Sequence, residues 1–179
     1  MRKLILAAAL ALAACAAPGG VTTSATLAAS DAATSLAVGQ HLTMSTTTRS
    51  APPDSGQDPV IIMRLRHPDG REMAFEEANH APMHIMAQTP GGPLAQIMGL
   101  FGEERPTLYL ARRGENRGEP FLCAPEGPAT LGLYRAEDGA VQVVGLRQQI
   151  QFEQRPDGQT EAVPYSPDQV CARLRFRQG

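Results

Sequence analysis

Two Pro-Asp-Gly tripeptides, at residues 68–70 and 156–158, each stand between short runs in which polar and apolar side chains alternate. Asp-Gly readily adopts the positive backbone φ angles that tight hairpin turns require. Alternation with a period of two is typical of a strand with one face buried. We therefore expect two β-hairpins, whose strands run over residues 60–66, 71–77, 150–154 and 159–163.

A third hairpin is predicted around Glu137-Asp138-Gly139, between strand-like runs at 130–135 and 141–146. Further strands are expected at 107–111 and at 172–176, which brings the total to about eight. The 17 glycines and 15 prolines in 179 residues also favour a turn-rich chain over long helices. The pattern predicts a mainly β fold, either an antiparallel sandwich or a small barrel.

One short helix is expected after Pro93, a residue type that suits the first helical position. The apolar side chains that follow lie at i, i+3, i+4 and i+7 and predict a buried helix face; they are Leu94, Ile97, Met98 and Phe101. Gly102 is expected to end this helix.

The N-terminus carries an export signal. Arg2 and Lys3 precede an apolar run over residues 4–14, which is shorter than the roughly 20 residues that span a bilayer. The run ends in Leu12-Ala13-Ala14-Cys15, which resembles the lipobox of bacterial lipoproteins. That resemblance implies Sec-type export, lipidation of Cys15 and removal of residues 1–14, whereas ordinary cleavage after a small residue such as Ala17 is the alternative.

The resemblance also implies a location. Ala16 and Ala17 follow the cysteine, and neither is the Asp that retains such lipoproteins at the inner membrane of enterobacteria. The expected location is therefore the periplasmic side of the outer membrane, with N-terminal acyl chains in the lipid bilayer. Residues 15–58 are rich in Ala, Ser, Thr, Gly and Pro, so we predict a flexible linker, followed by a β-rich periplasmic domain over 59–179. The β-prone stretch 36–48 leaves an edge strand as an alternative for part of the linker.

Cys123 and Cys171 are the two cysteines that remain after Cys15. Thiols of exported proteins are normally oxidised, so the sequence favours a disulfide between them.

Two histidines and two methionines fall within seven residues, at His80, Met83, His84 and Met86. Thioether and imidazole ligands together suit copper, especially Cu(I). His84-x-Met86 also resembles the His-x-Met end of the motif of cupredoxin-like periplasmic copper chaperones, although the His-Met pair that opens that motif is missing. The alternative is that these residues pack in a core.

Arginines alternate with apolar residues in two of the predicted strands. If those strands pair, the arginines form a cationic strip that binds phosphates of lipid A, phospholipid or an acidic polymer. The strip comprises Arg64, Arg66, Arg173, Arg175 and Arg177. The alternative is an ordinary charged outer face, neutralised by nearby glutamates.

The sequence constrains the function mainly by the classes of function that it disfavours. The chain has 16 basic and 18 acidic residues, which argues against binding to nucleic acid, and no Gly-x-Ser-x-Gly, His-Glu-x-x-His or phosphate-loop motif is present. Lys3 is the only lysine, so a mature chain has no Schiff-base residue. We expect a non-catalytic envelope lipoprotein without a cofactor, which binds or scaffolds an unidentified envelope protein or glycan; a periplasmic copper-binding protein is the alternative.

Overall fold

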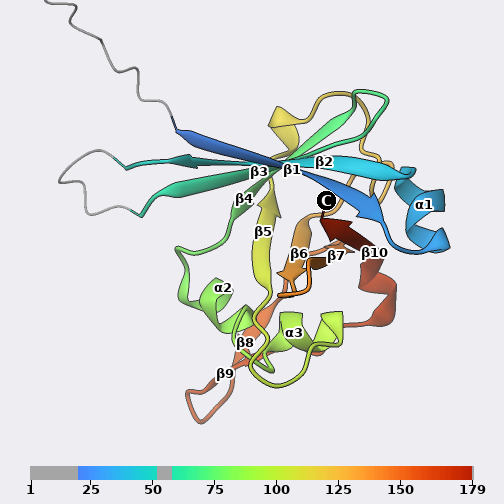
Figure 1. Ribbon diagram of the computed structural model, residues 1–179. Helices are drawn as coiled ribbons and strands as arrows, with labels where there is room; N and C mark the ends of the chain where they lie inside the picture. Colours follow the sequence, from blue (N-terminus) through green and yellow to red (C-terminus); the bar gives the residue numbers. More distant parts are fainter. Residues whose placement is uncertain (1–19, 52–57, 179) are drawn as a thin grey trace, which may run out of the picture.

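The computed structural model describes residues 20–51 and 58–178. Eight antiparallel strands close into a barrel in the order β1-β10-β7-β6-β5-β4-β3-β2 (Figure 1). The barrel strands are β1 (Val21–Ala29), β2 (His41–Arg49), β3 (Val60–Arg66), β4 (Glu72–Glu77), β5 (Thr107–Ala111), β6 (Thr130–Arg135), β7 (Ala140–Leu146) and β10 (Val170–Gln178). The mainly β prediction is confirmed, and the closed barrel is the architecture that the chain adopts.

The three predicted hairpins are present. β3 pairs with β4, β6 with β7, and β8 (Phe152–Gln154) with β9 (Thr160–Ala162), which forms a separate two-stranded sheet. Each turn contains a glycine with φ between 82° and 95°. The local turn chemistry therefore places these strands correctly without help from the rest of the chain.

The prediction of a flexible linker over residues 15–58 is wrong for most of that range. Residues 21–49 form β1, the helix α1 (Ala32–Val38) and β2, and both strands belong to the barrel. A strand does form within the segment 36–48, but β2 is not an edge strand, because it pairs with β1 on one side and with β3 on the other. The composition suggested a linker because most outward-facing side chains of these strands are small or polar. In contrast, the apolar side chains of Leu27, Leu42 and Met44 point inward and are buried.

α1 closes a side of the barrel where strand pairing is short. Only three residues of β1 pair with β10. Beyond them, the Thr34 hydroxyl accepts a hydrogen bond from the backbone N–H of Arg175 at 2.9 Å, while Asp31 caps the helix through the N–H of Thr34. Val38 is fully buried and joins the barrel interior. α1 thus continues the wall of the barrel where the backbone ladder ends.

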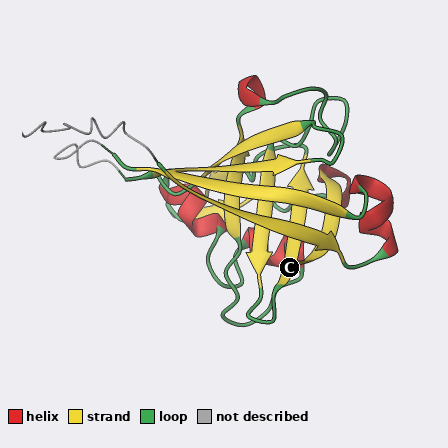
Figure 2. Ribbon diagram, turned by 45° about the horizontal axis from the view of Figure 1, so that its top comes forward, coloured by secondary structure: helices red, strands yellow, loops and turns green. Residues whose placement is uncertain are grey.

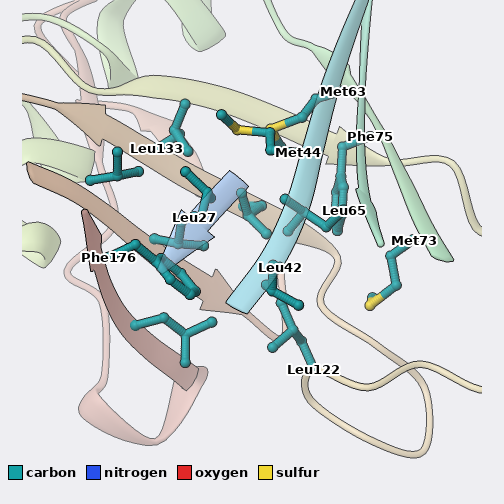
Figure 3. Packing of buried hydrophobic residues seen from close by; sticks show 14 of the residues in the cluster. Leu27, Leu42, Met44, Met63, Leu65, Met73, Phe75, Leu122, Leu133 and Phe176 are labelled. Atoms are coloured by element: carbon teal, nitrogen blue, oxygen red, sulfur yellow. The ribbon is translucent and has the colours of Figure 1, made fainter. Parts of the chain in front are cut away.

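The barrel interior is filled by apolar side chains (Figure 3). They come from all eight barrel strands, from α1 and from the segment that precedes β6. The largest of them that are fully buried include Leu27, Leu42, Met63, Leu65, Phe75, Leu131 and Phe176.

A second apolar core lies outside the barrel wall. The helices α2 (Pro82–Ala87) and α3 (Pro93–Met98) lie at the periphery of the barrel (Figure 2) and contribute to a cluster with the outer faces of β5, β6 and β7. A Cβ atom at Gly132 of β6 would lie 2.7 Å from a methyl carbon of Leu94, so the close approach of α3 requires glycine there. The helix predicted after Pro93 is confirmed, but it ends at Met98, and Phe101 is 83% exposed instead of buried.

The disulfide between Cys123 and Cys171 is present, with the two Cα atoms 5.3 Å apart. It joins the segment before β6 to the second residue of β10, across a sequence separation of 48 residues. No helix within the described ranges is long and apolar enough to cross a membrane.

Candidate ligand site at the barrel mouth

The inward-facing positions change from apolar to polar along the barrel. Near the β1–α1–β2 connection they are leucine, valine and phenylalanine. At the other end, where β1 and β3 begin and β2, β4 and β6 finish, the same rows continue with polar side chains. These are Thr23, Thr46, Thr48, Glu77, Thr107 and Arg135. We call this end the barrel mouth.

The barrel mouth contains an open pocket of about 370 Å³, within the size range of small-ligand sites. Its lining consists of Thr23, Thr46, Thr48, Ile61, Glu77, Arg105, Thr107, Tyr109, Leu133 and Arg135. Six of the eight barrel strands therefore contribute to one polar hollow at the end of an otherwise filled barrel.

Arg135 reaches across the barrel mouth. Its Nη2 donates to the sulfur of Met44 at 3.5 Å, although Arg135 ends β6 and Met44 lies on β2, which is not a neighbour of β6 in the sheet. Met44, Met63 and Leu133 lie together at this level of the interior (Figure 3). The guanidinium group thus lies over the apolar interior and lines the pocket above it.

Glu77 and Tyr109 are directly opposite each other on β4 and β5. Burial raises the pKa of Glu77, and the nearby His80 opposes that shift. Burial and the charge of Glu77 raise the pKa of Tyr109 to about 12, and Arg135 acts against them. The Tyr109 hydroxyl therefore keeps its proton at neutral pH and remains a hydrogen-bond donor.

Three charged side chains around the pocket have no ionic partner within the described part of the chain. Among the residues that the structure describes, Glu77, Arg105 and Arg135 take part in no salt bridge, whereas Arg64, Arg71 and Arg112 each pair with a carboxylate. A partly desolvated carboxylate and two arginines around one hollow are thus available to a ligand that carries complementary groups.

The raised pKa of Glu77 leads to a prediction about stability. Because the folded pKa exceeds the unfolded value, Glu77 destabilises the protein progressively as pH rises from the unfolded pKa through the folded pKa. Glu77→Gln should therefore raise the urea midpoint at pH 7 and leave it nearly unchanged at pH 3, where both forms are neutral. A lower midpoint for the variant at pH 7 would contradict this. Exposed Glu103→Gln serves as the matched control.

The predicted copper residues are only partly brought together. His80 precedes α2, and Met83, His84 and Met86 lie on this helix. Pro82 permits the helix because it occupies the first turn, where no N–H is needed. His80 and His84 line a hollow of about 260 Å³ together with Glu76, Glu77 and Arg112, but neither methionine does.

The predicted arginine strip does not form. β3 and β10 do not pair, because β2 and β1 lie between them in the barrel. Arg64 instead pairs with Glu72 at 3.2 Å and Glu115 at 2.6 Å, and Arg173 donates to the backbone oxygen of Ile97 at 2.8 Å. The two strands have the same alternation, which indicates their outer faces but carries no information on which strands are neighbours.

The barrel mouth was missed at the sequence level, although a signal was present. Glu77 continues the inward series Met73, Phe75, and Arg135 continues the series Leu131, Leu133. A charged residue at an inward position of a strand end is unusual unless it faces solvent or a ligand.

Cys15 lies outside the described residues, so its predicted lipidation stays a prediction. No cluster of three or more His, Cys, Asp or Glu side chains suited to a metal ion occurs within residues 20–51 and 58–178. Comparisons of the chain with protein-family models, with curated proteins and with solved structures find no match.

Proposed function

We propose that this protein is a cell-envelope lipoprotein, anchored through Cys15, with a non-catalytic binding role, and that its ligand binds in the barrel mouth. The observation that carries the proposal is the polar pocket of about 370 Å³ at the end of a filled barrel. Glu77, Arg105 and Arg135 line it without salt-bridge partners among the described residues. Positively and negatively charged groups around one hollow are better suited to bind a small polar ligand than to bind the flat surface of another protein.

Photocrosslinking tests the binding role. A benzophenone amino acid replaces Thr48, which lines the pocket, or Thr43, which is exposed on the outer face of the same strand. After irradiation of intact cells, a discrete mass adduct is expected on the Thr48 variant and absent from the Thr43 control. Equal labelling of both variants, or none at Thr48, would refute ligand binding at the barrel mouth.

The anchor is tested by Cys15→Ser. The wild-type protein should partition into the detergent phase and incorporate labelled palmitate, because more than one acyl chain holds a protein firmly in a bilayer. The Cys15→Ser variant should move to the aqueous phase. Retention of the variant in the detergent phase would show that another segment anchors the chain. Cys123→Ala/Cys171→Ala is the matched cysteine control and should still incorporate palmitate.

Copper binding is the second candidate, and the exposure of two methionines favours it. Met83 and Met86 are 48% and 39% exposed and lie three residues apart on α2, so they share a helix face. A Cu(I) competition titration should then give one-to-one binding that is lost in Met83→Ala/Met86→Ala. Unchanged affinity in this variant would rule the methionines out as ligands.

A further inference from the structure

If the protein is anchored through Cys15 and binds its ligand in the barrel mouth, as proposed above, the position of the barrel mouth relative to the anchor narrows the choice of ligand. β1 begins at Val21, six positions after Cys15. Even a fully extended chain of that length covers at most about 22 Å. Thr23, two residues into β1, already lines the pocket. A lipidated Cys15 therefore holds the barrel mouth, and not the α1 side, near the membrane surface.

The charges of the pocket indicate a ligand with both a negative and a positive group. Arg105 and Arg135 supply guanidinium donors, which suit phosphate oxygens. The Glu77 carboxylate can accept hydrogen bonds. The charges of Glu77 and Arg135 act on the Tyr109 hydroxyl in opposite directions: Glu77 raises its pKa and Arg135 lowers it. A simple anion would satisfy the arginines and leave the partly buried Glu77 carboxylate without a partner.

The surroundings of the pocket carry charges of both signs. The β6–β7 turn follows Arg135 and carries the exposed carboxylates Glu137 and Asp138, and the exposed Arg49 ends β2 at the same end of the barrel. The barrel mouth is therefore not a purely cationic surface of the kind that anionic membranes attract. A neutral, zwitterionic headgroup matches this mixture of charges.

We propose that the barrel mouth holds the phosphoethanolamine headgroup of a phospholipid from the membrane in which the protein is anchored. The phosphate lies against Arg105 and Arg135, and the ammonium group lies against Glu77. A pocket of about 370 Å³ takes a headgroup and not a whole lipid, so the acyl chains stay in the bilayer.

The test uses the Cys15→Ser protein and three soluble probes, titrated by NMR. Glycerophosphoethanolamine is expected to bind more tightly than glycerophosphoglycerol, which lacks the ammonium group, and than inorganic phosphate. Arg105→Ala should weaken glycerophosphoethanolamine binding ~10-fold, and the exposed Arg105 carries no packing that would unfold the protein. Arg66→Ala, an exposed arginine on the outer face of β3, is the control and should bind as the wild type does.

Glu77→Gln isolates the contribution of the ammonium group. It should remove the preference for glycerophosphoethanolamine over glycerophosphoglycerol and retain the affinity for glycerophosphoglycerol. The mass that crosslinking in cells adds to the Thr48 variant should equal the mass of a phosphatidylethanolamine. Equal binding of inorganic phosphate, or of glycerophosphoglycerol, would overturn the headgroup assignment. An adduct of another mass would overturn it as well but leave the proposed binding role intact, whereas the absence of any adduct would remove both.

Discussion

Phe75→Ala should lower the free energy of unfolding by about 3–5 kcal/mol. Phe75 is fully buried in the barrel interior (Figure 3), and in the strand register it lies opposite Met63 on β3 and Ala111 on β5. Its removal leaves a cavity that the closed barrel wall cannot collapse to fill, because each strand is held by hydrogen bonds on both sides. Urea unfolding should show a lower midpoint with an unchanged m-value.

Phe101→Ala is the matched control, since it removes the same side chain from a position that is 83% exposed. Its effect should stay within about 0.5 kcal/mol. If Phe75→Ala were as mild as Phe101→Ala, the barrel interior would not be the principal core.

Removal of the disulfide should have an effect of similar size. The bridge closes a loop with a sequence separation of 48 residues, for which the chain-entropy model gives ~4 kcal/mol. The Cys123→Ala/Cys171→Ala variant should therefore melt roughly 8–16 °C below the wild type in a calorimetric scan. The double replacement leaves no buried free thiol to complicate the comparison.

Reduction provides the control for this prediction. Addition of a reductant should lower the melting temperature of the wild-type protein to near that of the variant and leave the variant unaffected. A reductant effect on both proteins, or on neither, would show that the bridge does not account for the difference.

The hairpins could be predicted from the sequence because their determinants are local. The turn at Asp69-Gly70 and the alternation that runs to Glu77 lie within a few residues of each other, and backbone preference plus side-chain periodicity specify the pairing. The same holds for β6 and β7. The bridge between Cys123 and Cys171 followed from the count of cysteines and from the export signal.

The pairing of β1 with β10 could not be predicted in the same way. It joins Leu27 to Gln178, nearly the whole length of the chain apart. β1 has few apolar residues because its outer face is solvent-exposed and its inner face runs into the polar barrel mouth. Its stability as a strand comes from neighbours on both sides, and not from its own composition. The linker prediction failed for this reason.

The sequence by itself thus determined the turns, the positions of six barrel strands and the two cysteines that pair, because these depend on residues close together or on counting. Only the tertiary structure decided that the barrel closes, that β2 and β1 separate the two arginine-bearing strands, and that Glu77, Arg105 and Arg135 surround one pocket. Period-two patterning indicates which face of a strand is buried but not which strands lie beside it. A site assembled from six strands therefore exists only after closure has brought their ends together.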